Sequence, residues 1–254
     1  MANPITKGID VSKHNGTIDW KMVKASGQVD FAILRAGFGK LTSQKDERFE
    51  EYYEKARAAG VPIGAYWYSY VATKKEKAHY NINDAIAEAE QEADACLAAL
   101  KGKKFEYPIW YDVEEMETLA LGINGLPKVI EAFCNKLEAA GYWVGVYMSA
   151  APMSSVISDA IRNRYSCWVA HVNVPAPKYS HRYDMWQYSW KGKIPGINGD
   201  VDMDYCYVDY PALIKSNGKN GYTIEPPKPA ALETKDITLV FDGVKYTGTL
   251  TRSE

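Results

Sequence analysis

The sequence predicts an α/β fold, an irregular parallel barrel followed by a short β tail. Over roughly the first 150 residues, about five continuous apolar runs alternate with helical patterns, and continuous apolarity is typical of strands covered on both faces. About three more strand-like runs follow with little helix between them, which makes the predicted barrel irregular. The chain has 254 residues, 46% of them hydrophobic, and barrels of about 250 residues commonly form one undivided domain.

The expected strands are residues 8–12, 31–39, 61–70, 109–114, 143–149, 167–172, 185–190 and 201–207. Short and medium helices are expected from about residue 20 and over residues 46–59. Thr73-Lys74-Lys75-Glu76 has capping-box spacing and is expected to open a long helix that reaches about Leu100. Pro127 suits the first turn of the next helix. Right-handed crossovers are expected between the parallel strands.

The composition changes near the C-terminus. Residues 215–232 are rich in Asn, Gly, Lys and Pro, as linkers are. Residues 237–250 then alternate around Asp242-Gly243, a strong signal for a two-residue hairpin turn. A lone hairpin is marginal in water, so it is expected to pack on the barrel, pair with another copy or be the stub of a further strand system. The expected division is a barrel, a linker and a hairpin tail, at residues 1–214, 215–233 and 234–254.

Charge and hydropathy exclude several classes of partner. The formal net charge of -2 argues against nucleic acid or an anionic membrane held by bulk electrostatics. The sequence contains no apolar run long enough to span a membrane. Residues 1–8 lack the apolar segment of a signal peptide, so we expect synthesis in the cytoplasm. The 19 Tyr and 7 Trp residues offer flat apolar faces with polar edges, which suit sugar rings.

The sequence predicts neither a metal nor a cofactor. The four cysteines are far apart and are expected to be buried thiols. Asp200-Val201-Asp202-Met203-Asp204 begins like a calcium loop, but Tyr205 stands where that loop needs glycine. Pro211 stands where the bidentate glutamate belongs, so the calcium interpretation fails.

An apolar stretch from Tyr107 ends abruptly in Asp112-Val113-Glu114-Glu115, as a buried strand would that delivers acids to its exposed end. If the strand continues to Glu114, Asp112 and Glu114 share a face with Cα atoms roughly 6.6 Å apart. Their repulsion would raise the pKa of one of them. A protonated acid beside an ionised one is the equipment of glycoside hydrolysis. The alternative is a strand that runs into an acidic, solvated loop.

Active sites of α/β barrels lie at the carboxyl ends of the strands. Several polar residues are expected late in these strands: Asp10, Arg35, Asp112, Glu114, Gln187, Asp202 and Asp204. Aromatic residues accompany them, namely Tyr66, Tyr68, Tyr147 and Trp186. A buried carboxylate is costly, so Asp10 and Asp202 are strong candidates for a function. Converging acids with aromatic walls predict a carbohydrate cleft.

The ordered set of motifs resembles the family 25 glycoside hydrolases, the Chalaropsis-type lysozymes (N-acetylmuramidases) of bacteria and their phages. The resemblance covers roughly residues 5–214, not the tail, and no single motif would carry it. It depends on the following segments: Gly8-Ile9-Asp10-Val11-Ser12, Asn15 to Trp20, Phe31 to Gly39, Gly64 to Tyr68, Tyr111-Asp112-Val113-Glu114, Gly145-Val146-Tyr147, Trp168-Val169-Ala170, Trp186-Gln187-Tyr188 and Val201-Asp202-Met203-Asp204.

The resemblance implies an irregular β/α barrel that cuts the β-1,4 bond between N-acetylmuramic acid and N-acetylglucosamine in bacterial peptidoglycan. It implies Glu114 as proton donor, Asp112 as nucleophile or stabiliser of positive charge, and Asp10 and Asp202 as an acidic floor. The residues expected to bind substrate are Tyr66, Tyr68, Arg35, Tyr147, Trp186, Gln187 and Asp204. The family often has Asn where this chain has Asp204. A phage or prophage endolysin, released to the wall by a separate pore-former, is the expected context. For the hairpin tail, pairing with another copy or attachment to the cell wall is favoured.

The stereochemical route stays open at this stage. A direct nucleophile requires carboxyl groups about 5 to 5.5 Å apart, and inversion requires about 6.5 to 9.5 Å. In a third route the acetamido group of the substrate attacks, and Asp112 orients it. Two other functions are alternatives, a glycan-binding module without catalysis and a chitinase-like barrel. Chitinase-like enzymes carry a longer D-x-x-D-x-D-x-E run, whereas Ile109, Trp110 and Tyr111 precede Asp112 here.

Overall fold

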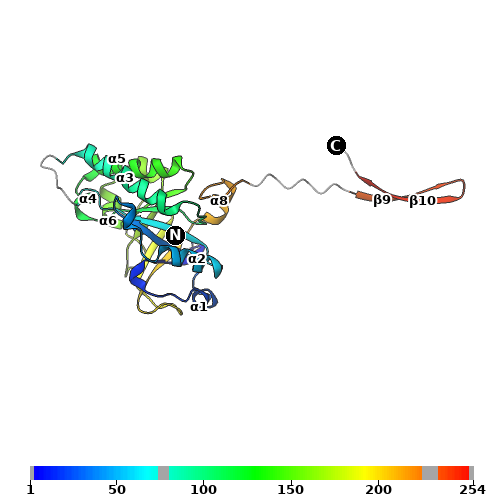
Figure 1. Cartoon of the computed structure of the whole chain (residues 1–254), viewed down its shortest axis with the longest axis horizontal. Helices are drawn as coiled ribbons and strands as arrows, with labels where there is room; N and C mark the ends of the chain where they lie inside the picture. Colours follow the sequence, from blue (N-terminus) through cyan, green and yellow to red (C-terminus); the bar gives the residue numbers. More distant parts are fainter. Residues whose placement is uncertain (1–2, 74–79, 225–233, 252–254) are drawn as a thin grey trace. The chain divides into compact units, whose positions relative to one another are not determined.

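The computed structural model describes residues 3–73, 80–224 and 234–251. The chain forms two compact units, Met1–Thr223 and Ile224–Glu254 (Figure 1). The first unit is a closed eight-stranded barrel with helices around it, and the second is a two-stranded antiparallel sheet. Most of the expected capping box, Lys74 to Glu76, and the Pro-rich residues 225–233 lie outside the described residues.

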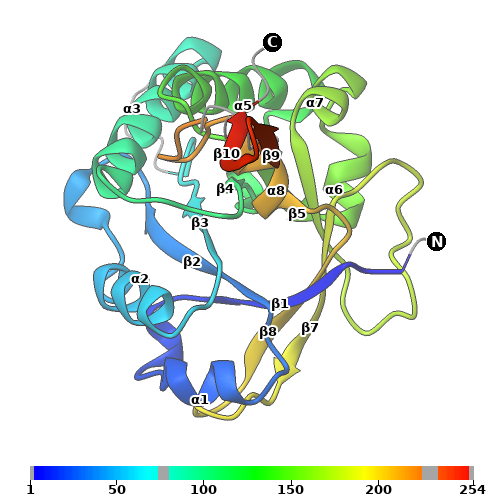
Figure 2. The same ribbon diagram turned by 90° about the vertical axis from the view of Figure 1, so that its right-hand side faces the viewer.

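The barrel strands follow one another around the ring in chain order (Figure 2). They are β1 (Thr6–Val11), β2 (Phe31–Phe38), β3 (Ile63–Tyr68), β4 (Ile109–Asp112), β5 (Val144–Ser149), β6 (Ser166–Ala170), β7 (Met185–Gly192) and β8 (Val201–Cys206). Strands β1 to β7 pair in parallel, each with its predecessor. Strand β8 is antiparallel to both β7 and β1 and closes the ring. The predicted α/β barrel is therefore confirmed, and the antiparallel closure is its irregular feature.

Helices cover the outside of the barrel between the strands. They are α1 (Trp20–Ala25), α2 (Phe49–Ala58), α3 (Ile82–Leu100), α4 (Met116–Leu119), α5 (Gly122–Ala139), α6 (Ala150–Ser155), α7 (Asp159–Arg164) and α8 (Tyr210–Ser216), with short 3₁₀ turns at Lys13–Asn15 and Thr42–Gln44. The prediction of little helix between the last three strands is confirmed, since no helix of the described residues lies between β6 and β7 or between β7 and β8. Helices α6 and α7 follow the fifth strand as the helical part of the fifth β/α unit. Across the described residues, no helix has the length and apolarity that a membrane crossing needs.

Two helix starts differ from the sequence prediction. Helix α3 begins at Ile82 because the Asn81 side chain accepts from Asn83 N and the Asp84 side chain accepts from Asn81 N, a capping box eight residues after Thr73. Helix α5 begins at Gly122 and contains Pro127, which was expected in its first turn. Helix α3 ends at Leu100, as predicted.

Strand alternation divides the core into two layers. Phe31, Trp110 and Trp168 belong to a cluster inside the barrel, whereas their strand neighbours pack outward against the helices. The interior cluster needs glycine at Gly145, because an added Cβ there would lie 2.3 Å from the Trp110 ring. Tyr210 of α8 packs on Trp110 with ring centroids 6.1 Å apart, so α8 covers the end of the barrel where the parallel strands begin. The opposite end carries the polar side chains.

Residues beyond α8 remain attached to the barrel. The Asn220 side chain is buried, accepts from Trp143 N at 2.7 Å and donates to the Tyr107 carbonyl at 2.8 Å. These bonds explain why the first compact unit extends to Thr223. The functional division at residues 1–214, 215–233 and 234–254 stays a prediction.

The second unit is the predicted hairpin, formed by β9 (Thr234–Phe241) and β10 (Val244–Thr251) (Figure 1). Its two-residue turn is Asp242-Gly243, with φ angles of 48° and 73°. Both residues are in the left-handed region, which glycine and aspartate tolerate and which matches the twist of a tight hairpin. The structure thus confirms the hairpin turn.

Candidate active site

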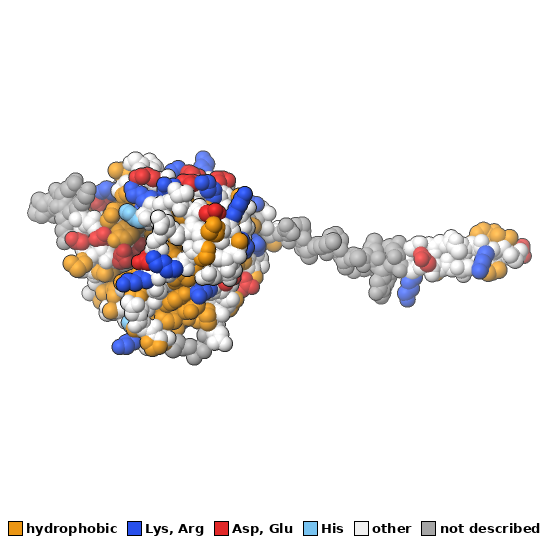
Figure 3. Space-filling view, turned by 90° about the horizontal axis from the view of Figure 1, so that it is seen from below, with side chains coloured by type: hydrophobic (Ala, Val, Ile, Leu, Met, Phe, Trp, Pro, Cys, Tyr) orange, Lys and Arg blue, Asp and Glu red, His pale blue; other side chains and the backbone are white. Residues whose placement is uncertain are grey.

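The expected acids meet at one end of the barrel because β8 runs backwards. Asp10 lies near the end of β1, and Asp112 is the last residue of β4. Asp202 is the second residue of β8, yet it is the direct Cα partner of Asp10, since β8 is antiparallel to β1. The start of β8 therefore lies with the carboxyl ends of the parallel strands, where barrel active sites form. Figure 3 shows one face of this unit, on which a group of acidic side chains lies next to hydrophobic and basic ones.

Gln187 on β7 joins two of these acids. Its Nε2 donates to Asp10 Oδ2 at 2.8 Å and to Asp202 Oδ2 at 3.2 Å. Its Oε1 accepts from the Tyr147 hydroxyl at 2.8 Å and from Trp190 Nε1 at 3.0 Å. The amide nitrogen and the amide oxygen of Gln187 thus each make two hydrogen bonds, which fixes the orientation of the two carboxylates.

Asp204 is completely buried below Asp10. Trp168 Nε1 donates to its Oδ1 at 2.9 Å, and its Oδ2 has no hydrogen-bond partner among the described residues. Burial raises the pKa of Asp204 well above its ordinary value, and the charge of Asp202 raises it further. Burial also raises the pKa of Asp10, followed by the charges of Asp204 and Asp202. Because neighbouring buried carboxylates repel each other, this pair holds a proton more tightly than free aspartates do.

Asp112 is buried, and its Oδ1 has no hydrogen-bond partner in the described part of the chain. Its backbone carbonyl accepts from Ser69 N at 2.9 Å, which ties the end of β4 to the loop after β3. Burial raises the pKa of Asp112 well above the ordinary value, the charge of Glu114 adds to this, and Arg35 opposes it. Asp112 and Glu114 therefore interact electrostatically, as their spacing predicts.

Glu114 lies just outside the strand, since β4 ends at Asp112 and not at Glu114 as expected. Val113 N still donates to the Tyr147 carbonyl at 3.1 Å, so the chain stays attached to β5 for one more residue. Partial burial of the carboxyl raises the pKa of Glu114, the Tyr68 hydroxyl lowers it, and the Glu115 charge raises it. Burial and the Glu114 charge raise the pKa of Asp202 to about 6. Glu114 thus acts on acids from two different strands.

The expected aromatic and polar residues have different positions. Tyr66 and Tyr147 are buried in the interior cluster beside the acids. The Tyr68 hydroxyl donates to Glu115 Oε1 at 2.8 Å. Arg35 Nε donates to the buried Asp46 at 2.7 Å, so this guanidinium is held in place, and its charge lowers the pKa of Asp112.

Trp186 is the expected residue that the structure does not bring to the acids. It precedes Gln187 on β7, so its side chain points to the other face of the strand. Its Nε1 donates to the His171 carbonyl at 2.8 Å, and its ring packs on Tyr188 and Tyr205. The other expected site residues lie in or beside the acidic cluster.

Glu92 is a residue that was not predicted from the sequence, and it is buried on α3. Glu92 accepts from Tyr70 N and from the Tyr111 hydroxyl, both at 2.7 Å. Burial raises its pKa to about 7, which the hydrogen bonds from Tyr111 and Tyr70 oppose. A signal existed, because Ala85, Ala89, Glu92 and Cys96 follow helical spacing along the buried face of α3.

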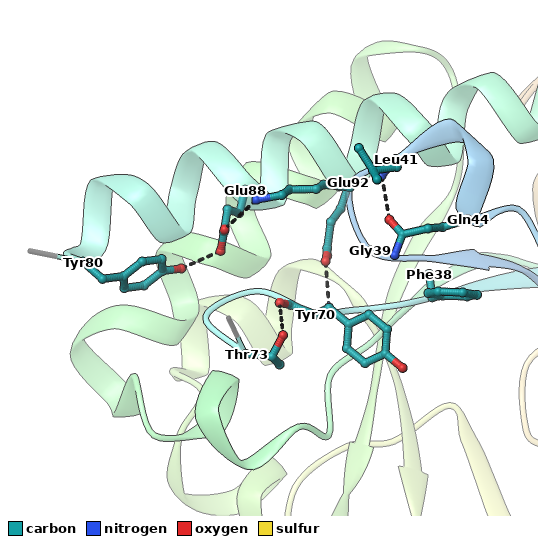
Figure 4. Close-up of a pocket in the computed structure, with 10 residues that line it drawn as sticks. Phe38, Gly39, Leu41, Gln44, Tyr70, Thr73, Tyr80, Glu88 and Glu92 are labelled. Carbon is teal, nitrogen blue, oxygen red and sulfur yellow. Dashed lines mark hydrogen bonds and ion pairs between the residues drawn. The ribbon is translucent and has the colours of Figure 1, made fainter. Parts of the chain in front are cut away.

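A pocket of about 690 Å³ lies beside this network (Figure 4). Its walls come from three segments, the end of β2 with the following loop, the loop after β3, and α3. They contribute Phe38, Gly39, Lys40, Leu41, Gln44, Tyr70, Thr73, Tyr80, Glu88 and Glu92. Tyr70 packs edge-on against Phe38 at 5.6 Å and against Tyr68 at 5.2 Å, so an aromatic series runs from Glu115 to the pocket.

A barrel with clustered carboxyls at its mouth is the arrangement of a glycoside hydrolase. Residues 9–197 match the family model for glycosyl hydrolases family 25, and the chain belongs to that family. The autolytic lysozyme of Clostridium acetobutylicum is 27% identical over 198 residues, 78% of this chain and 55% of that protein. Lysozyme M1 of Streptomyces globisporus is 28% identical over 208 residues, 78% of this chain and 66% of that protein. The chain thus spans between half and two thirds of these relatives.

Solved structures agree with this assignment. The CTP1L endolysin superposes with a TM-score of 0.69 and 26% identity, over 84% of this chain and 70% of that one. A bacterial lysozyme of Streptomyces coelicolor superposes with a TM-score of 0.66 and 25% identity, over 80% of this chain and 92% of that one. The family resemblance read from the motifs is therefore confirmed, and the barrel is the fold of its relatives.

Proposed function

We propose that this chain hydrolyses the glycan strands of bacterial peptidoglycan, at the β-1,4 bond between N-acetylmuramic acid and N-acetylglucosamine. The observation that carries the proposal is the carboxyl pair of Asp112 and Glu114 at the mouth of the barrel. Burial raises the pKa of both residues, and the charge of Glu114 raises the pKa of Asp112 further. Family membership and the lysozymes among the relatives support the same substrate class.

In this proposal Glu114 is the general acid. Its side chain is exposed at the strand end, where a glycosidic oxygen can reach it, and its raised pKa keeps it protonated to a higher pH. A proton donor works best when its pKa is close to the working pH. Tyr68, whose hydroxyl bonds to Glu115 next in the chain, would fix one side of the acid.

Asp112 would act as the second carboxyl in its ionised form. It would either attack the anomeric carbon or stabilise positive charge there and on the acetamido group of the substrate. Arg35 supports both roles, because its positive charge lowers the pKa of Asp112 and favours ionisation. The Oδ1 of Asp112 is buried and has no protein donor among the described residues, so it keeps an unused capacity to accept a hydrogen bond, which an N–H of the substrate would satisfy.

Asp10, Asp202 and Gln187 would form the floor on which the sugar sits. The Gln187 amide holds the two carboxylates in fixed positions, and preorganised groups lose little on binding. Tyr66, Tyr147 and Asp204 would support that floor, and Tyr70, which packs edge-on against Tyr68, would offer an aromatic face to the pocket of Figure 4. Trp186 would support β7 from outside the barrel.

The test is a comparison of the wild type with Glu114→Gln on purified peptidoglycan, reading the sugar at each new reducing end. Gln keeps the shape of Glu and removes the acid, so release should fall by about 10²- to 10⁴-fold. Glu117→Gln, an exposed acid on α4, is the matched control and should retain full activity. Muramic acid at the reducing ends supports the proposal.

Other outcomes would replace it. Equal release by wild type and Glu114→Gln would remove Glu114 from the mechanism. Glucosamine at the new reducing ends would indicate a different bond. Binding of the wall without any release would show a glycan-binding module.

A further inference from the structure

The hairpin unit has two chemically different faces. Cross-strand partners share a face, so the register of β9 and β10 assigns each residue. One face, here called the apolar face, carries Ile237, Leu239, Phe241, Val244, Tyr246 and Leu250, together with Lys235 and Gly248. The opposite face carries Asp236, Thr238, Val240, Lys245, Thr247 and Thr249, and Thr249 donates to Asp236 at 2.8 Å across the strands.

The apolar face is not covered within its own unit. The exposed fractions are 61% for Leu239, 73% for Phe241 and 56% for Tyr246, and Val244 and Leu250 are exposed to similar extents. Two strands alone cannot bury such a face, and an isolated hairpin is marginal in water. A contiguous apolar patch of this kind marks an interaction site.

The chemistry of the face favours a protein partner. Five of its six apolar side chains are aliphatic or Phe, whereas sugar recognition relies on Tyr and Trp faces with polar edges. The exposed large apolar residues of the barrel unit, such as Met22, Met116 and Trp190, belong to different elements and offer no matching stripe. A second copy of the hairpin does offer one, because it carries the same face at the same length.

We propose that two copies of this chain associate through the apolar faces of their hairpins. The two sheets would pack face to face about 10 Å apart, the spacing of stacked sheets, with the same residues contributed by both copies. Gly248 lies on this face, and a Cβ added there would meet nothing within 4 Å. It leaves a hollow next to Tyr246 and Leu250 that a side chain of the second copy can enter.

The size of the face sets the strength of the association. A strand of eight residues is roughly 26 Å long and two strands are about 10 Å wide, so the flat projection of the two faces together is roughly 520 Å². Most apolar side chains that protrude from each face are more than half exposed, so the accessible area that the two faces bury is larger, up to about 1,000 Å². Specific interfaces start at about this area. The dissociation constant of the dimer is therefore expected to lie in the micromolar range. The dimer should raise the overall affinity of the enzyme when both barrels bind the same surface.

On the basis of the proposed function, that surface is the bacterial wall. When one barrel has bound a glycan strand, the second binds from a local concentration set by the linker. Dimerisation should then raise the activity on intact walls and leave the activity on short soluble glycans unchanged. The hairpin would thus give the enzyme avidity for a polymeric substrate.

The test uses the full chain in sedimentation or light-scattering measurements from about 1 to about 100 µM, the range in which such a small interface dissociates. The wild type should approach twice its mass of 28.4 kDa at the upper end. Leu239→Asp places a charge on the apolar face and should give a monomer. Val240→Asp is the matched control, since Val240 is the next residue and faces the other way; it should stay dimeric.

The proposal is overturned if the wild type is monomeric at every concentration, or if Leu239→Asp and Val240→Asp behave alike. Lysis of intact walls by Leu239→Asp should fall about tenfold or more relative to Val240→Asp. Equal hydrolysis of soluble glycan by both variants shows that the barrel is intact. The mass measurement requires no catalysis, so it stands even if the chain proves to act on another bond.

Discussion

Asp10 and Asp202 are direct partners across the antiparallel closure of the barrel, and the single amide of Gln187 donates to both of their carboxyls. One comes from the first strand and the other from the last. The charge of Asp202 raises the pKa of Asp10, and the charge of Glu114 raises the pKa of Asp202. The site is thus an electrostatic unit in which removal of one charge changes the others.

Asp202→Asn should move the alkaline limb of the pH–activity profile to lower pH. The charge of Asp202 raises the pKa of Asp10, so that pKa should fall. The charge of Glu114 raises the pKa of Asp202, and repulsion between two charges acts on both groups. Loss of the Asp202 charge should therefore also lower the pKa of Glu114, and the proton for the leaving group is lost at lower pH. Turnover should also fall by about tenfold or more, because the floor loses a carboxylate. The measurement is kcat/KM against pH on soluble glycan.

Asp200→Asn is the control for that experiment. Asp200 lies two residues before Asp202, but it is exposed and forms an ion pair with Lys193. Its profile should match that of the wild type. An unchanged limb in Asp202→Asn would show that Asp202 does not contribute to the field at the acid.

Asp204→Asn should stabilise the protein at neutral pH. The folded-state pKa of Asp204 is raised, so the wild type loses stability as pH rises above the ordinary pKa of the residue, 3.8. Asn still accepts from Trp168 Nε1 and carries no charge. The melting temperature should rise by a few degrees at pH 7 and hardly at pH 4. A lower melting temperature at pH 7 would contradict the raised pKa.

Glu92→Gln should remove a pH dependence of stability that the wild type shows. The pKa of Glu92 is raised from 4.5 to about 7, so the wild type loses stability between those values as pH rises, and Gln does not. The bond between Ser69 and Tyr111 can reverse, so the Tyr111 hydroxyl can accept from the new amide. Urea unfolding at pH 5 and pH 8 measures the difference. If the wild type and Glu92→Gln lose the same free energy of unfolding between pH 5 and pH 8, a group other than Glu92 causes the pH dependence.

Much of the site could be predicted from sequence because strands leave simple patterns. The stretch ending in Asp112 and Glu114 is a buried strand running into acids, and Asp10 lies late in β1 in the same way. Gln187 and Asp202 were expected late in their strands but lie near the starts of β7 and β8. Trp186 shows where the reasoning failed. Adjacent residues of a strand face opposite ways, so Trp186 and Gln187 could not both line one cleft.

Other features depend on more than local sequence. The direction of β8 depends on how the ring closes, and nothing within Val201–Cys206 distinguishes a parallel from an antiparallel strand. Helical spacing places Glu92 on the buried face of α3, but only the packing of α3 against β4 brings it to Tyr111. The capping box at Asn81 competes with similar spacing at Thr73, eight residues earlier in the chain.

The closure by β8 also bears on synthesis of the protein. Asp10 emerges from the ribosome early, but its partner Asp202 follows almost 200 residues later. Until β8 has been translated, β1 and β7 are both unpaired edges and half of the acidic floor is missing. A nascent or prematurely terminated chain should therefore be unable to cut glycan, and activity begins only with a barrel whose last strand has reached its first.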